Sequence, residues 1–140
     1  MSTSMVPAMA DFTMRNLRDV KDSAPDFGMA PDMEARFASR DLGLVESGIS
    51  LGRLAPNATQ PFGHRHERQE ELYVVVGGGG RMKLDDEVIE LRAWDAIRVG
   101  PSVRRALSAG ADGLEYLAFG APATGDPAAD VTMEPGWWDG

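Results

Sequence analysis

The sequence contains no cysteine and only two histidines. Without thiols the chain forms no disulfide and offers no thiolate as a nucleophile or a metal ligand. Any metal ion that it binds must therefore be held by nitrogen and oxygen atoms. The absence of cysteine is also compatible with a reducing compartment, and it leaves His64 and His66 as the only side chains with an imidazole nitrogen for a metal.

Long apolar runs are missing as well. No stretch approaches the roughly 20 apolar residues that a membrane-spanning helix needs, and the first residues, MSTSMVPAMADF, lack the basic and apolar regions of a secretory signal. Basic residues are outnumbered, with 14 Lys and Arg against 22 Asp and Glu, so the formal net charge is -8. An acidic surface repels nucleic-acid backbones and anionic membranes. We therefore expect a cytoplasmic protein that binds neither nucleic acid nor membrane.

The length of the chain predicts one domain. A chain of 140 residues can bury one hydrophobic core and is too short for two. The hydrophobic share of 43% is too high for a disordered acidic chain. We expect residues 1–10 to form a loosely attached arm and residues 11–140 to form the domain.

Short apolar or alternating runs dominate the chain from Glu34 onward. Turn residues separate them about every 8–12 residues, a spacing that predicts an all-β sandwich or barrel. Strands are expected at residues 34–39, 45–54, 63–66, 71–76, 80–84, 87–91, 96–99, 105–109 and 114–119. Before them, the helical spacing of Met14, Leu17 and Val20 predicts one short helix near residues 16–22.

Turn chemistry adds detail to this pattern. The pairs Asp85-Asp86 and Asp112-Gly113 each stand between two strand-like runs and predict tight hairpins. The chain closes with MEPGWWDG, in which two adjacent tryptophans are too apolar to leave free in water. We expect Trp137 and Trp138 to pack on the body of the protein.

The two histidines lie one residue apart in the stretch PFGHRHERQEELYVVVGGGG. Alternate residues of a strand share a face, so His64 and His66 converge while Arg65 points the other way. Glu71 begins the next apolar run and can bring a carboxylate to the same point. Two histidines and a carboxylate are a common ligand set for Fe(II), Mn(II), Zn(II) or Ni(II), with positions left for water or substrate. The pattern alone also fits two surface histidines in a charged loop.

The spacing of these residues resembles the first motif of the cupins. His64-x-His66 is followed after four residues by Glu71 and after six more by Gly78. The resemblance continues through GGGGRMKLDDEVIELRAWDAIRVGPSVRRALSAG and covers residues 49–119. It implies a small single-domain cupin, an antiparallel jelly-roll barrel (a double-stranded β-helix) with a short N-terminal helix or arm. It also implies a divalent metal in the barrel mouth, a small-molecule ligand, and a homodimer.

The second cupin motif departs from the family pattern. The end of that motif, Gly-x-x-His, maps onto the stretch from Ser102 to Arg105, so Ser102 replaces the glycine and Arg105 replaces the third histidine. An arginine is a permanent cation with no available lone pair, so it cannot ligate a metal. The fourth ligand of the family is therefore missing.

Two hypotheses follow from this substitution. In the first, His64, His66 and Glu71 hold the metal, and Arg105 is turned aside or binds an anionic substrate. In the second, Arg105 forms an ion pair with Glu71 in place of the metal, and the barrel is a metal-free binding pocket or a structural protein. Retention of three of the four ligands favours the metal.

The reaction depends on the ion. A ferrous site suits oxygenation, whereas manganese, zinc or nickel suits isomerisation, epimerisation or hydrolysis. With both histidines used as ligands, Tyr73 is the candidate catalytic acid or base, and Tyr73 and Arg105 are the candidate substrate contacts. A binding protein without catalysis and a structural dimer are the alternatives to an enzyme.

Overall fold

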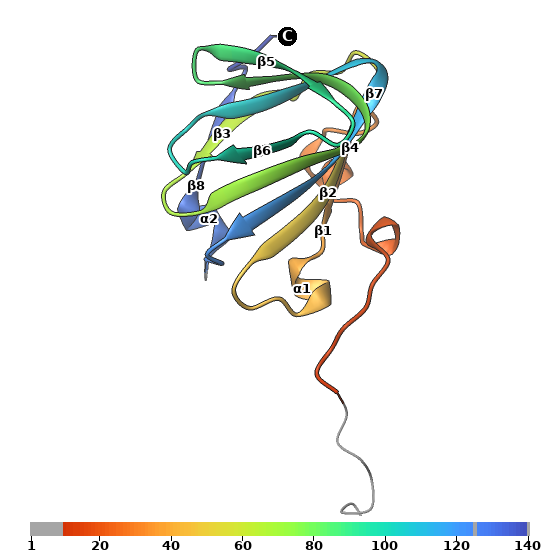
Figure 1. Cartoon of the computed structure of the whole chain (residues 1–140), viewed down its shortest axis with the longest axis vertical. Helices are drawn as coiled ribbons and strands as arrows, with labels where there is room; N and C mark the ends of the chain where they lie inside the picture. The colour runs from red at the N-terminus through yellow and green to blue at the C-terminus, as the bar shows by residue number, and fades with distance from the viewer. Residues whose placement is uncertain (1–9, 125, 140) are drawn as a thin grey trace, which may run out of the picture.

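The computed structural model describes residues 10–124 and 126–139, which form an antiparallel β-sheet curled into a half-barrel (Figure 1). The expected arm at residues 1–10 lies outside the described residues except for Ala10. The N-terminal segment leads into two short 3-10 helices, η2 (Leu17–Asp19) and η3 (Ala24–Phe27). The elements that follow are β1 (Met33–Phe37), α1 (Ser39–Leu42), β2 (Gly48–Leu54), β3 (Phe62–His66), β4 (Glu70–Leu84), β5 (Glu87–Arg92), β6 (Ala96–Val99), β7 (Arg105–Ala121), α2 (Pro127–Asp130) and β8 (Val131–Pro135).

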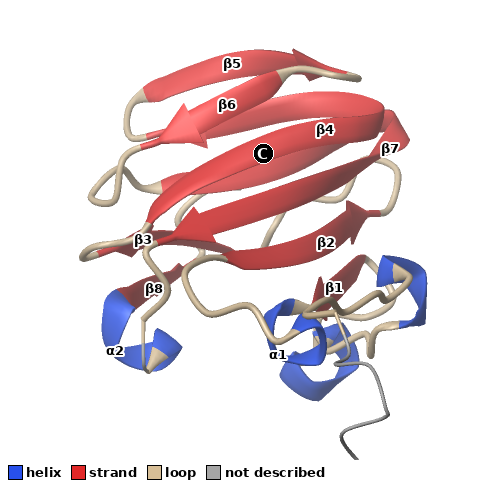
Figure 2. Cartoon of the chain, turned by 60° about the horizontal axis from the view of Figure 1, so that its bottom comes forward, coloured by secondary structure: helices blue, strands red, loops and turns tan. Residues whose placement is uncertain are grey.

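Two long strands, β4 and β7, organise the sheet. The strand order is β1-β2-β7-β3-β8, while β4 pairs with β5, β6 and β7. The first half of β4 lies along the second half of β7, and the second half of β4 lies along the first half of β7. Strands distant in sequence therefore become neighbours around the curved sheet (Figure 2). The prediction of an all-β antiparallel jelly roll is confirmed.

The core is built mainly from alternate residues of the strands. Its fully buried side chains come mainly from β2, β4, β6 and β7: Leu54, Val75, Met82, Val99, Leu107 and Leu114. Burying one such side chain stabilises the fold by about 1.5–3 kcal/mol. Within residues 10–124 and 126–139, no helix is long and apolar enough to cross a membrane.

Each of the two long strands replaces two shorter strands that the sequence predicts. The expected strands at 71–76 and 80–84 are one strand, β4, and those at 105–109 and 114–119 are one strand, β7. The hairpin expected at Asp112-Gly113 is therefore wrong. The glycines that suggested turns instead let the two strands bend together, with register shifts between Val75 and Gly77 and between Gly78 and Gly80.

The other turn predictions have mixed outcomes. The Asp85-Asp86 hairpin is confirmed between β4 and β5. The helix expected at residues 16–22 is wrong in type and length, because only Leu17–Asp19 form a 3-10 turn. Val20 is already extended and buried, while Met14 is 82% exposed, so the helical spacing does not correspond to one buried face.

The C-terminal segment adds elements that the sequence did not predict. Helix α2 leads into β8, which pairs with β3 along its whole length. Trp137 lies against Gly63 of β3, and its ring is 4.4 Å from the Lys83 ammonium. The ring of Trp138 is 5.3 Å from the Arg81 guanidinium. Packing of both tryptophans on the body is therefore confirmed.

Candidate metal centre

Strand pairing brings the two histidines to the start of β4. His64 and His66 alternate along β3, and His64 stands opposite Arg105, the first residue of β7. Glu71 near the start of β4 pairs with Val99, the last residue of β6, and the backbone N–H of His66 donates to the carbonyl of Pro101 just after β6 at 2.8 Å. The three side chains come from two strands, β3 and β4, which therefore meet beside the connection from β6 to β7.

The ligand atoms of the three side chains are close enough to share one ion. Nε2 of His64 lies 3.2 Å from Oε1 of Glu71, and Nε2 of His66 lies 3.3 Å from the same oxygen. All three ligand atoms are within 4.8 Å of one another. Ligands bound to one ion at about 2.1 Å lie about 3.0 Å apart in an octahedral site and about 3.4 Å apart in a tetrahedral site. The group can therefore hold a metal ion.

The carboxylate at this point belongs to Glu71 and not to its neighbour. Glu70 is exposed on the opposite face of β4, where its Oε1 is 3.3 Å from the Arg98 guanidinium. The side chain of Glu71 is only 12% exposed. Neighbouring residues of a strand point to opposite faces, so when Glu71 faces the histidines Glu70 faces solvent, as the expected register requires.

Two further side chains donate hydrogen bonds to the same oxygen of Glu71. The hydroxyl of Tyr73 donates to Oε1 at 2.7 Å, and Nη1 of Arg105 donates to it at 2.7 Å. Nη2 of Arg105 donates to the carbonyl oxygens of Gly100 at 2.7 Å and Pro101 at 3.3 Å. Tyr73 is 4% exposed and Arg105 is 1% exposed, so both are more deeply buried than the histidine side chains.

The charges of the group follow from its burial and its hydrogen bonds. Burial by itself raises the pKa of Glu71, but the hydrogen bonds from His64 and the Tyr73 hydroxyl are among the contacts that outweigh it and hold that pKa far below its usual value. Burial lowers the pKa of His64 despite the nearby carboxylate. Burial also raises the pKa of Tyr73 well above its ordinary value. Glu71 is therefore an anion, whereas His64 is a neutral imidazole and Tyr73 a neutral phenol.

His66 has a second partner that sequence reasoning missed. Nδ1 of His66 lies 3.0 Å from Oδ2 of Asp130, the last residue of α2. Burial raises the pKa of Asp130, but the backbone N–H of Arg68, His66 and the N–H of Gln69 together lower it below the usual value. Asp130 stands in an Ala, Pro, Gly and Asp stretch with no metal-site spacing, so no local signal could have identified it.

The position of the proton on His66 indicates whether His64, His66 and Glu71 suit a metal ion. A carboxylate only accepts, so the proton of a neutral imidazole stays on Nδ1 and Nε2 carries a lone pair. That buried Nε2 has no hydrogen-bond partner among the described residues, and it faces the Glu71 carboxylate at 3.3 Å. A lone pair facing a carboxylate is repulsive unless a cation stands between them. The donor set therefore fits a divalent ion.

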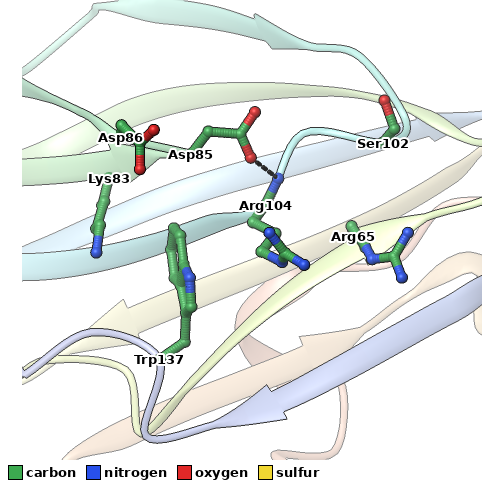
Figure 3. A pocket seen from close by; sticks show the side chains of 7 residues that line it. All are labelled: Arg65, Lys83, Asp85, Asp86, Ser102, Arg104 and Trp137. Carbon is green, nitrogen blue, oxygen red and sulfur yellow. Dashed lines mark hydrogen bonds between the residues drawn. The ribbon is translucent and has the colours of Figure 1, made fainter.

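A separate cavity of about 400 Å³ lies on the other face of β3. It opens beside Arg65, which alternates with the two histidines. Its walls carry charges of both signs (Figure 3): Arg65, Lys83 and Arg104 against Asp85 and Asp86. Neither histidine lines the cavity, so it is distinct from the histidine site.

No protein-family model matches this chain, and no curated protein matches its sequence. Solved structures do match it. A cupin protein from Bacteroides fragilis is 25% identical with a TM-score of 0.67, and the match covers 84% of this chain and 90% of that one. A sugar phosphate isomerase of the cupin superfamily from Silicibacter pomeroyi is 15% identical with a TM-score of 0.65, over 88% of this chain and 92% of that one.

Oxalate decarboxylase from Bacillus subtilis is also similar, with a TM-score of 0.73 and 16% identity. The match covers 94% of this chain and 34% of that chain, so the present chain spans about a third of the decarboxylase. The chain therefore has the cupin fold, with a group of two histidines and one glutamate that can hold a metal ion.

Proposed function

We propose that the protein holds a divalent ion, Fe, Mn, Zn or Ni, at His64, His66 and Glu71 and there binds or transforms a small anionic metabolite. The observation that carries the proposal is the buried Nε2 of His66, which faces Glu71 without a hydrogen-bond partner among the described residues. When bound, such an ion acts as a Lewis acid and offers open positions to an oxygen-bearing ligand. Oxygenation and isomerisation are the reaction classes that these ligands suit.

Tyr73 and Arg105, the expected substrate contacts, act in this proposal mainly through Glu71, to which both donate a hydrogen bond. Because the pKa of Tyr73 is raised, its hydroxyl acts as a hydrogen-bond donor or an acid and not as a base. Arg105 is 1% exposed, and its two terminal nitrogens are bonded to Glu71 and to backbone carbonyls. This burial favours a role in which Arg105 orients Glu71 and adds positive charge beneath the anionic ligand.

The ion pair between Arg105 and Glu71 supports a second candidate function. Its 2.7 Å contact supplies the carboxylate with a cation in the absence of any metal. In that case the cupin is a metal-free binding or structural protein, and the two histidines line its pocket.

Metal analysis separates the two candidates. Elemental mass spectrometry of untagged protein, purified without chelators, is expected to find near-stoichiometric divalent metal. We expect the metal to be lost from the double variant His64→Ala/His66→Ala and from the single variant Glu71→Gln, because each variant lacks at least one residue that binds the ion. Glu70→Gln is the matched control, since that neighbouring carboxylate faces outward, and it should keep the metal. Wild-type protein that is metal-free and takes up no added Fe(II), Mn(II), Ni(II) or Zn(II) would leave only the metal-free candidate.

We also propose that the protein is a homodimer. Large apolar side chains of the N-terminal third stay in solvent, with Phe12 77% exposed, Phe37 58% exposed and Val45 82% exposed. Strand β1 also stands at one end of the strand order, where an unpaired edge can meet a second chain. Light scattering coupled to size exclusion should give about twice the 15.1 kDa chain mass. A monomer mass at every protein concentration would contradict the proposal.

A further inference from the structure

Asp130 is held rigidly against the histidine strand. It ends α2 directly before β8, and the pairing of β8 with β3 sets Val131 opposite His66. The backbone carbonyl of Asp130 accepts the Glu67 N–H at 2.8 Å, and the residue is 5% exposed. The carboxylate therefore has little freedom to turn away from His66.

The two oxygens of Asp130 have different partners. Oδ1 accepts the backbone N–H of Arg68 at 2.9 Å. Oδ2 accepts the N–H of Gln69 at 3.3 Å and lies 3.0 Å from Nδ1 of His66. By contrast, the buried Nδ1 of His64 has no hydrogen-bond partner within the described part of the chain. Only His66 thus has a hydrogen-bond partner outside the three candidate ligands, because the partner of His64 is Glu71 itself.

We propose that Asp130 is a positioning residue of the metal centre, because it keeps the proton of His66 on Nδ1 and leaves Nε2 free to bind the ion. The inference rests on the proposed function, since it assumes that His64, His66 and Glu71 hold a metal. It also makes the C-terminal segment a functional part of the barrel. Carboxylates that bond a ligating histidine in this way commonly change metal affinity by about 10–100-fold.

Asp130→Asn tests the inference with little change of shape. When the amide oxygen keeps the shorter bond from the Arg68 N–H, the amide NH2 takes the place of Oδ2 and faces Nδ1 of His66, and only the longer 3.3 Å bond from the Gln69 N–H is lost. A donor at that position requires Nδ1 to accept, which moves the imidazole proton to Nε2 and blocks the ligating lone pair. We expect the affinity for Mn(II) and Co(II), measured by titration calorimetry, to fall about 10–100-fold. Asp126→Asn is the control, because Asp126 is exposed and only caps the N–H of Ala128 in the same helix.

Nitrogen-15 NMR of the metal-free protein supplies the readout that a purely structural role would not move. In mildly alkaline buffer, the His66 signals should show the proton on Nδ1 in the wild type and on Nε2 in Asp130→Asn. The His64 signals should stay unchanged. Asp130→Ala, which removes the acceptor without adding a donor, should lose less affinity than Asp130→Asn.

The outcomes separate this inference from the proposed function. A wild type that binds no metal contradicts the function, whereas the NMR comparison still tests the tautomer. If the wild type binds metal but Asp130→Asn binds it equally well, or keeps the proton on Nδ1, the positioning role is wrong. Equal losses in the alanine and asparagine variants, each folded by circular dichroism, would also overturn the role, because the tautomer would then not matter.

Discussion

Replacing Arg105 with glutamine is expected to lower the free energy of unfolding of the metal-free protein by about 3–5 kcal/mol, the usual effect of removing one partner of a buried ion pair. Arg105 is 1% exposed and donates to the Glu71 carboxylate at 2.7 Å. Without it, a buried anion and the carbonyl oxygens of Gly100 and Pro101 lose their charged donor. Urea denaturation followed by circular dichroism, with a chelator present, measures the loss.

Arg104→Gln is the matched control for this experiment. Arg104 is the preceding residue, and its side chain is 45% exposed in an ion pair with Glu134 at 2.7 Å. Surface ion pairs of this kind contribute about 0–1 kcal/mol. If Arg105→Gln were no more destabilising than Arg104→Gln, the ion pair with Glu71 would not be a structural element of the core.

The same variant also shows whether a metal ion can take over the role of Arg105. A ligand that binds only the folded state adds about 2.7 kcal/mol of stability when its concentration is a hundredfold above Kd. Repeating the urea titration of Arg105→Gln with saturating Mn(II) instead of chelator should therefore recover much of the lost stability. An absence of recovery would favour the metal-free candidate function.

Replacing Gly78 with alanine is expected to lower the free energy of unfolding by about 2–5 kcal/mol. Gly78 has φ +65, in the left-handed region where a side chain costs about 1–2 kcal/mol. A Cβ there would also collide with the carbonyl oxygen of Gly113 on the neighbouring strand. Such overpacking adds about 1–3 kcal/mol. Thermal and urea unfolding of the variant measure the sum.

Gly77→Ala provides the comparison within the same stretch. The nearest atom to an added Cβ at Gly77 is Cβ of Glu115 at 3.7 Å, an ordinary contact, and its φ lies outside the left-handed region. This variant should change stability by no more than about 1 kcal/mol. Equal losses at the two positions would mean that the β4–β7 pair can shift to accept a side chain at Gly78.

The predictions that succeeded rest on local pattern. Alternating apolar residues located the strands of the barrel, because the period of two belongs to the strand itself and needs no partner. Asp85-Asp86 identified a hairpin for the same reason, since a tight turn is determined by the residues within it. The convergence of His64 and His66 likewise follows from their spacing on β3.

The predictions that failed concern segments whose structure depends on residues far away in the sequence. The glycines at 77–80 and Asp112-Gly113 have the composition of turns, yet they lie within two continuous strands. Pairing of β4 with β7 supplies the hydrogen bonds that keep the chain extended there, and the local preference for a turn is overridden. Met14, Leu17 and Val20 have helical spacing, but burial of Val20 against the body requires extended backbone.

The sequence by itself determined an acidic all-β barrel without thiols, with two histidines on one strand face and a glutamate at a spacing that suits a metal. Only the tertiary structure decided which groups surround them. Asp130 stands 64 positions from His66 in the sequence, and Arg105 stands 34 positions from Glu71. No local sequence pattern links residues that far apart. Pairing of β8 with β3 brings Asp130 to His66. Glu71 pairs with the end of β6, and the connection that follows β6 leads Arg105 back to it. Hydrogen bonds between strands form regardless of how far apart the strands lie in the chain.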